Sequence, residues 1–340
     1  MPIISILRRF RANLLGKWSP VFGLAALMVA PSLSRADLFV VDSDTVGRFS
    51  SSTGAVIQTN GQNAFTTLVG ATGVTVGPDA RVYVGTSNPG FDPNLAVVNR
   101  YNATTGQRVG GAFITYANDP SQLSNAQGMS FGPDGNLYIA DIGDDGSVKA
   151  FNANGGYLTS YLTTGGNAQA VAFNPSASGD VYVATGGTIE RINLTTHADS
   201  VIVQGSSATF SDAADLAFGP DGKLYVLDPG ATPRIFRYNA DGTGQTVFAD
   251  FSSPTFSPAI FQPTDMAFGP DGHLYVSGES LNAPTSQQGE VLRLTADGSS
   301  STEFVTNLYT PGFLAFSDVP EPSSLSLFAG SLFFLRRPKR

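Results

Sequence analysis

Gly128 to Asp141, which reads GMSFGPDGNLYIAD, is the stretch of sequence that decides the fold. An apolar strand runs into Gly-Pro-Asp-Gly, and an alternating strand centred on Tyr138 follows. Proline presets the backbone angle at its position, and the second glycine accepts a positive φ, so these four residues favour a tight turn. The stretch therefore predicts two antiparallel strands joined as a hairpin.

The same phrase recurs along the chain, five times in all. The intervals between successive copies are 55, 42, 45 and 50 residues. Repeats of this length with four strands each are typical of the blades of a β-propeller. The apolar strands of the five copies end at Val76, Phe131, Phe173, Phe218 and Phe268.

Each copy continues with a third strand and then a weaker fourth one, such as Tyr157 to Leu162. The third strand ends in a basic residue, an apolar residue and asparagine, with one extra residue in the second copy. These endings are Arg100-Tyr101-Asn102, Lys149-Ala150-Phe151-Asn152, Arg191-Ile192-Asn193 and Arg237-Tyr238-Asn239.

The two ends of the repeated body together make one more blade. Residues 37–60 contain a second, third and fourth strand but no first, and the stretch from Pro311 supplies a first strand with nothing after it. Pairing the end of the chain with its beginning would leave no open sheet edge. The sequence therefore predicts an all-β fold: a six-bladed β-propeller over residues 37–318, with four-stranded blades and one blade split between the N- and C-termini.

These repeats resemble the NHL family of propellers and, more loosely, the gluconolactonase and senescence-marker-protein group. The closest matches are Asp141 to Gly146, which follow Tyr138-Ile139-Ala140, and Pro263 to Phe268. The resemblance covers Asp37 to Phe316. It implies the architecture but no single activity, because such propellers include enzymes, binding modules and scaffolds.

Residues 1–36 have the pattern of a secretory signal peptide, with an uncleaved membrane anchor as the alternative. A basic region precedes the apolar run Val21 to Ala30, which is too short to span a bilayer stably. Ser34-Arg35-Ala36 provides small residues for cleavage before Asp37. The basic residues are Arg8, Arg9, Arg11 and Lys17.

Residues 319–340 resemble the PEP-CTERM sorting signal of bacterial exosortase substrates. The tail contains Pro320-Glu321-Pro322, an apolar segment from Leu325 to Leu335, and a basic end that begins at Arg336 and Arg337. The apolar segment would span about 17 Å as a helix, against a hydrocarbon core of ~30 Å. The basic end favours the cytoplasmic side. The resemblance implies export to the cell envelope, surface or extracellular matrix, with signal peptidase and an exosortase-type enzyme as processing partners.

The composition narrows the range of partners. The chain carries 27 acidic and 19 basic residues, and many of the basic ones lie in the two end segments. An acidic body does not suit nucleic acid, which requires clustered Lys and Arg. The membrane is expected to be contacted only transiently, through the termini. The chain contains no cysteine, so it has neither disulfides nor a thiolate nucleophile.

Polar residues at the start of the first strands are the candidates to face a ligand. Asp215 and Asp265 occupy one position in successive repeats, and Gln127 and Gln169 lie near that point in earlier ones. Carboxylate and amide oxygens suit Ca²⁺, so Asp215 and Asp265 form a candidate calcium site. The alternative is that each Asp accepts hydrogen bonds from nearby backbone donors. The same two alternatives apply to the acids that end second strands: Asp42, Asp141 and Asp228.

Two functions follow from these features. The first is an extracellular binding or matrix module whose ligand is a polysaccharide or a protein. The second is a calcium-dependent hydrolase of the gluconolactonase type, in which a Glu and Asn residues would hold the metal at the mouth of the ring. The corresponding positions here are Thr72, Gln127, Gln169, Ala214, Thr264 and Gly312. The residues assign no catalytic group.

Overall fold

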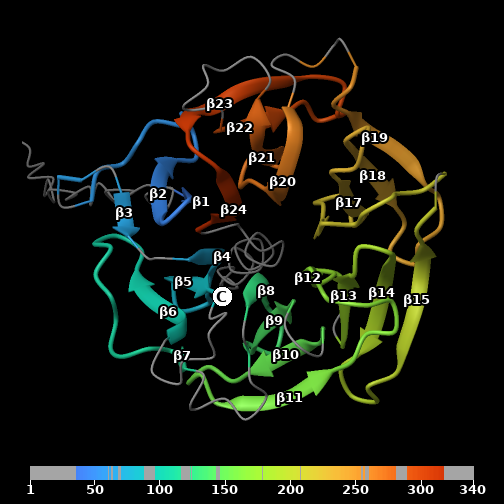
Figure 1. The fold of residues 1–340 in the computed structure, drawn as a ribbon, viewed down its shortest axis with the longest axis horizontal. Coiled ribbons are helices and arrows are strands. Elements are labelled where there is room, and N and C mark those ends of the chain that lie inside the picture. Colours follow the sequence, from blue (N-terminus) through green and yellow to red (C-terminus); the bar gives the residue numbers. More distant parts are fainter. Residues whose placement is uncertain are drawn as a thin grey trace, which may run out of the picture. The chain divides into compact units, whose positions relative to one another are not determined.

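The computed structural model describes residues 36–317, except 60, 63, 68–69, 88–95, 116–122, 124, 143–145, 178, 207, 254–255, 257–259 and 281–288. The regular elements in these ranges are 24 strands. They form six four-stranded sheets arranged as a ring (Figure 1). Within the described ranges, no helix has the length and hydrophobicity to cross a bilayer. The predicted six-bladed β-propeller is confirmed.

Each blade is an antiparallel sheet, and in five of the six blades the strands follow one another in chain order from the ring axis outward (Figure 1). Blade 2 contains β4 (Ala71–Val76), β5 (Arg81–Thr86), β6 (Ala96–Asn102) and β7 (Ile114–Thr115). Blade 3 contains β8 (Ala126–Phe131), β9 (Leu137–Asp141), β10 (Val148–Phe151) and β11 (Tyr157–Tyr161). Blade 4 contains β12 (Ala170–Ala172), β13 (Asp180–Ala184), β14 (Thr188–Asn193) and β15 (Asp199–Gln204).

The next two blades follow the same plan. Blade 5 contains β16 (Asp215–Phe218), β17 (Leu224–Asp228), β18 (Arg234–Tyr238) and β19 (Thr246–Asp250). Blade 6 contains β20 (Ile260–Phe268), β21 (Leu274–Ser280), β22 (Gly289–Leu294) and β23 (Ser301–Leu308).

The remaining sheet is the split blade, in which the end of the body completes its beginning. Its strand order is β24-β1-β2-β3, and Leu38 lies opposite Phe316. The Asp37 N–H donates to Ser317 Oγ at 2.8 Å, and the Ser317 N–H donates to the Asp37 carbonyl oxygen at 2.9 Å. The predicted split blade is therefore confirmed. Its strands are β1 (Asp37–Asp42), β2 (Thr45–Ser50), β3 (Ala64–Thr67) and β24 (Pro311–Phe316).

Aromatic contacts join the neighbouring blades at five of the six junctions of the ring. The tyrosine at the centre of a second strand packs against the phenylalanine that ends the next blade's first strand, with ring centroids 4.8 to 5.0 Å apart. Such near edge-on pairs add stabilisation to the burial of both rings. The five pairs are Tyr83–Phe131, Tyr138–Phe173, Tyr182–Phe218, Tyr225–Phe268 and Tyr275–Phe316.

The two glycines of the repeated turn are required for different reasons, one by these ring contacts and one by backbone geometry. At Gly132, a Cβ atom would lie 2.7 Å from the Tyr138 ring and 3.1 Å from the Phe173 ring. Gly135, the last residue of the same turn, has φ of 77°, which is a conformation that glycine adopts readily. The first glycine is therefore selected by close packing and the second by its positive φ.

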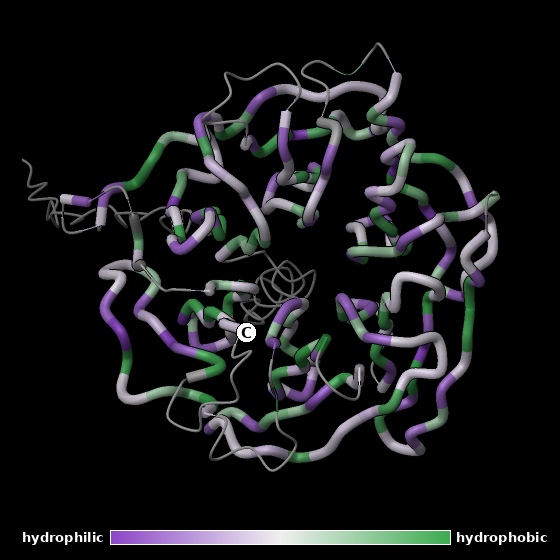
Figure 2. The backbone as a smooth tube through the Cα atoms, viewed as in Figure 1, coloured by the Kyte–Doolittle hydropathy of each residue, from purple (hydrophilic) through white to green (hydrophobic). Residues whose placement is uncertain are grey.

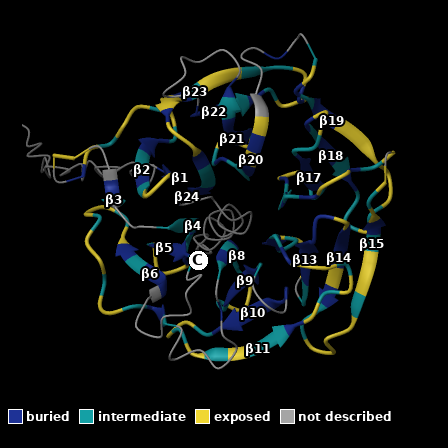
Figure 3. Cartoon of the chain, in the orientation of Figure 1, coloured by how far each residue is buried: buried dark blue, intermediate teal, exposed yellow. Residues whose placement is uncertain are grey.

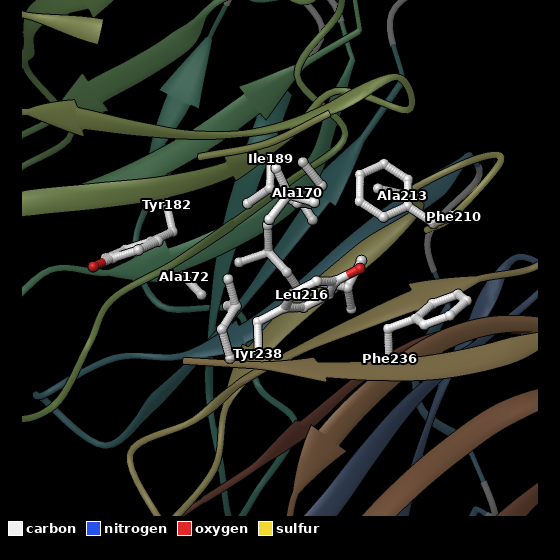
Figure 4. Packing of buried hydrophobic residues seen from close by; sticks show 13 residues of the cluster. Ala170, Ala172, Tyr182, Ile189, Phe210, Ala213, Leu216, Phe236 and Tyr238 are labelled. Atoms are coloured by element: carbon white, nitrogen blue, oxygen red, sulfur yellow. The ribbon is translucent and has the colours of Figure 1, made fainter. Parts of the chain in front are cut away.

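The core is divided among the interfaces between blades. Apolar residues occur in every blade (Figure 2), and six buried clusters each combine side chains from two neighbouring blades. Figure 4 shows the cluster where Tyr182 of blade 4 lies near Leu216 and Tyr238 of blade 5. Exposed residues gather on the outer strands, such as β15, β19 and β23 (Figure 3). Each blade thus relies on its two neighbours for most of its burial.

Candidate functional site

Asp215 and Asp265 lie at one register position on the innermost strands of blades 5 and 6. Asp215 begins β16 opposite Leu227, and Asp265 lies in β20 opposite Ser277. Their exposed fractions are only 7% and 6%. The two residues that the sequence selected are therefore equivalent in position and buried.

Each of these carboxylates reaches the inner strand of the following blade. The Met266 N–H donates to Asp215 Oδ2 at 2.9 Å, which joins blade 5 to blade 6. The Leu314 N–H donates to Asp265 Oδ2 at 2.7 Å, which joins blade 6 to the split blade. Both acids thus accept hydrogen bonds from backbone donors, as the second of the two sequence alternatives describes.

The two buried carboxyl groups also influence each other's protonation, and we call them the carboxyl pair. Burial raises the pKa of Asp215 to about 6, although backbone donors oppose the shift. Burial first, and then the charge of Asp215, raises the pKa of Asp265 well above its ordinary value. A buried pair of neighbouring acids holds one proton more readily than it holds two negative charges.

Gln127 and Gln169 contribute to this inner ring mainly through their backbones. The Gly128 N–H donates to the Gln169 carbonyl oxygen at 3.3 Å, and the Gln127 carbonyl oxygen lies against Gly73. The Gln169 side-chain amide lies against Gly186. Among the described residues, no hydrogen bond links either glutamine side chain to the carboxyl pair.

The calcium site on Asp215 and Asp265 stays a prediction. Within the described ranges, no group of three or more His, Cys, Asp or Glu side chains converges as metal ligands would. The carboxyl pair could supply two acidic ligands, but both acids already accept hydrogen bonds from backbone N–H groups. Binding a cation there would require the pair to lose its proton.

The acids that end second strands accept hydrogen bonds from loop backbones, as one of the two alternatives predicted. Asp42 accepts from the N–H groups of Tyr309 and Thr310 at 2.9 and 2.8 Å. Asp141 accepts from Asn125 N–H at 3.1 Å, and Asp228 accepts from Ser211 N–H at 2.9 Å. In each case the donor lies in the segment that leads into the same blade's first strand. These acids fix the entry of the chain into the split blade and blades 3 and 5.

Several buried charged groups were not identified from the sequence, among them Lys149 and Glu190. Lys149 is 2% exposed and its Nζ lies 2.6 Å from Asp141 Oδ2. Glu190 is fully buried and accepts hydrogen bonds from Thr188 Oγ1 and Thr164 N–H at 2.9 and 3.1 Å. The burial of both side chains depends on the β-strand register, which local sequence patterns do not specify. The signal available in the sequence was a charged residue one position before the place in the third strand where most repeats have an arginine.

The predicted sorting residues Pro320, Glu321, Pro322, Arg336 and Arg337 lie outside the described residues, as do residues 1–35 of the predicted signal peptide. These predictions rest on the sequence.

Comparisons with known proteins agree with the architecture. A family model described as "Domain of unknown function (DUF5122) beta-propeller" matches residues 269–304. No curated protein matches the chain in sequence. A solved structure titled as a nidogen/laminin complex contains a chain with TM-score 0.62 and 14% identity, covering 84% of this chain and 99% of that one. A protein of unknown function from Bacteroides caccae is similar, with TM-score 0.60, 11% identity, and coverage of 84% and 99%.

The fold and these comparisons define the class of protein: the chain is a six-bladed β-propeller. The matched family segment covers part of blade 6, from the turn after β20 into β23. At these sequence identities, the similarity to solved structures supports the fold alone. A propeller ring of this kind can serve several functions, so the function has to be argued from particular residues.

Proposed function

We propose that this propeller is an exported binding or matrix module that an exosortase-type enzyme sorts to the cell envelope. The tail from Pro320 to Arg340 carries the proposal, because a Pro-Glu-Pro motif, an apolar segment and a basic end occur together there. The positive-inside rule gives the basic end a physical role in holding the tail at the membrane.

The closure of the ring supports the removal of both ends. The split blade is completed by β1, which begins at Asp37, and by β24, which ends at Phe316. Its closing hydrogen bonds involve Asp37 and Ser317. Cleavage before Asp37 and within the tail would therefore leave every strand of the split blade in the mature protein.

The inner acids support a binding module more than a hydrolase. A calcium-dependent hydrolase needs oxygen ligands that are free to bind the metal, and an open coordination position. Asp215 and Asp265 are instead engaged by Met266 and Leu314 N–H groups. Asp42, Asp141 and Asp228 bond loop backbones. These carboxylates hold strands and loops in place, which suits a rigid scaffold for recognition.

Mass spectrometry of the mature protein tests the sorting proposal. We expect surface-exposed protein from an exosortase-containing host to begin at Asp37 and to lack Arg340. The variant Glu321→Ala should retain the tail and remain with the membrane fraction. The matched control Ser324→Ala, which leaves Pro-Glu-Pro intact, should be processed as the wild type is. Surface protein that retains Arg340 would contradict the proposal.

A further inference from the structure

One blade departs from a pairing that the other five share. In those five, an arginine of the third strand lies directly opposite the aromatic residue at the centre of the second strand. In blade 3, Ala150 lies opposite Tyr138. The five shared pairs are Phe39–Arg48, Tyr83–Arg100, Tyr182–Arg191, Tyr225–Arg237 and Tyr275–Arg293.

In blades 5 and 6 the arginine lies beside the acid of the hairpin turn. In blade 6, Arg293 Nη2 is 2.7 Å from Asp271 Oδ2, and the Tyr275 hydroxyl donates to the same oxygen at 3.1 Å. In blade 5, Arg237 Nη1 is 4.0 Å from Asp221 Oδ2, and its guanidinium carbon lies 6.0 Å from the centre of the Phe248 ring. A guanidinium group therefore fits between the turn carboxylate and a fourth-strand aromatic ring.

Blade 3 keeps the acid and the tyrosine but not the cation. The Tyr138 hydroxyl donates to Asp134 Oδ2 at 2.9 Å, and Asn136 Nδ2 donates to the same oxygen at 2.7 Å. Burial, and then the hydrogen bond to Asp134, raises the pKa of Tyr138, so this hydroxyl stays neutral. Among the ion pairs of the described residues, none involves Asp134. The Asp134 carboxylate thus accepts hydrogen bonds from neutral groups and has no cation beside it among the described residues.

The basic residue of this blade has moved to the opposite face of the sheet. Lys149 lies one residue before Ala150 and opposite Ile139. Because successive side chains of a strand point to opposite faces, this offset directs Lys149 away from Asp134. Its Nζ contacts Asp141 Oδ2 instead, at 2.6 Å. Lys149 therefore does not replace the arginine of the other blades.

A groove of about 450 Å³ lies beside Ala150, where the other blades have the arginine, between blades 3 and 4. Asp134, Tyr138, Ala150 and Tyr161 line it from blade 3, and Leu194 lines it from blade 4. The centres of the Tyr138 and Tyr161 rings are 6.2 Å apart. A volume of this size falls in the range of ligand pockets, roughly 300–1,000 Å³.

We infer that this groove binds a guanidinium group, supplied by an arginine of a partner polypeptide. The guanidinium would bond Asp134 and lie beside the tyrosine rings, in the arrangement that the chain's own arginines adopt in other blades. Arginine suits such a site because its planar donors pair with carboxylates and stack on aromatic rings. The body from 37 to 317 contains 25 acidic and ten basic residues, which favours the approach of a cationic partner.

Titration with small probes of the wild-type chain, followed by NMR, tests the inference. The probe is N-acetylarginine N-methylamide, and the neutral control is the citrulline analogue, which has nearly the same shape. We expect the arginine probe to shift resonances of groove residues and to bind at least about tenfold more tightly than the citrulline probe. The citrulline probe lacks the positive charge, and loss of a charged hydrogen-bond partner has about this cost. Equal affinity for the two probes would overturn the inference, and so would the absence of binding by the arginine probe.

Two variants locate the binding in the groove. Ala150→Arg restores the arginine of the other blades, so it should fold with unchanged thermal stability and lose at least about tenfold in affinity. Asp134→Asn should give a similar loss without filling the groove. Ala231→Arg adds the same charge at an exposed position of blade 5 and should bind as the wild type does.

Unchanged affinity in both Ala150→Arg and Asp134→Asn would place binding elsewhere and overturn the inference. A lysine analogue that binds as tightly as the arginine probe would overturn the guanidinium preference. Binding in the groove does not depend on where the protein is sorted, so failure of this test and failure of tail processing are separate results.

Discussion

The inner strands pack differently on two sides of the ring, although both sides use the same position of the repeat. From blade 2 to blade 4 that position holds Gly73, Gly128 and Ala170, and the strands approach closely. A Cβ atom on Gly128 would lie 2.5 Å from the Ala170 Cα atom. In blades 5 and 6 the position holds Asp215 and Asp265, whose side chains bridge to the next strand.

The difference shows that one repeat can join its neighbours in two ways. Small residues allow backbones to meet directly, as in the 3.3 Å bond from Gly128 N–H to the Gln169 carbonyl oxygen. Acids connect strands through a carboxylate and a backbone donor. The first kind of contact depends on shape alone. The second kind also depends on protonation, because its two acids are buried together.

Adding a methyl group to the small-residue side should have the largest effect. Gly128→Ala places a Cβ atom against backbone atoms of Ala170 that cannot move independently. We expect it to lower the free energy of unfolding by about 3 kcal/mol, the upper end of typical overpacking costs. Urea denaturation measures the change.

The matched control for this variant is Gly111→Ala, where a Cβ atom would meet nothing within 4 Å. It should leave the free energy of unfolding close to the wild-type value. If Gly128→Ala were as stable as this control, the small residues would not be required by close packing.

Removing a carboxylate from the other side should have the next largest effect. Asp265→Ala leaves the Leu314 N–H without its buried acceptor and Asp215 without its partner. The expected loss in the free energy of unfolding is about 2 kcal/mol, the usual cost of an unsatisfied buried polar group. The same denaturation experiment applies. A variant as stable as the wild type would show that the carboxylate does not join blade 6 to the split blade.

Chelation should have the smallest effect. Because the carboxyl pair accepts hydrogen bonds from backbone donors and burial raises the pKa of both acids, neither a chelator nor added Ca²⁺ should shift the thermal unfolding temperature of the protein without its tail. Differential scanning calorimetry measures this. A drop of several degrees on chelation would instead support the calcium site predicted at Asp215 and Asp265.

The sequence predicted the fold in some detail because its signals are local and repeated. The Gly-Pro-Asp-Gly turns, the spacing of Phe131 and its equivalents, and the unmatched strand at Pro311 were sufficient for six blades and a split one. Asp215 and Asp265 were recognised as equivalent positions of the repeat, with acceptance from nearby backbone donors as one of two open alternatives. That the donors belong to the next blade was not predicted, because it depends on contacts about 50 residues apart in the chain.

The groove could not be predicted because it depends on strand register. In the sequence, Lys149-Ala150 fits the pattern of basic third-strand endings. Only the pairing of Ala150 with Tyr138 shows that the lysine points to the other face. A shift of one residue in strand register turns a side chain to the other face of the sheet, and composition alone does not reveal the register.

The most direct test of the carboxyl pair is the pH dependence of stability in the wild type and in Asp265→Asn. The folded-state pKa of Asp215 is raised to about 6 from 3.8, and that of Asp265 is raised as well. Acids whose pKa rises on folding stabilise the protein at low pH and lose that contribution as pH increases through the folded-state value. An asparagine at 265 can donate to Asp215 and accept from Leu314 N–H at any pH.

Burial also raises the pKa values of Glu190 and Glu290, so the difference between wild type and variant isolates the pair. We predict that the free energy of unfolding of the wild type, from urea denaturation at pH 4 to 8, falls more steeply with increasing pH than that of Asp265→Asn. The variant should be the more stable of the two at pH 8. Parallel curves for the two proteins would contradict a shared proton at the junction of blades 5 and 6.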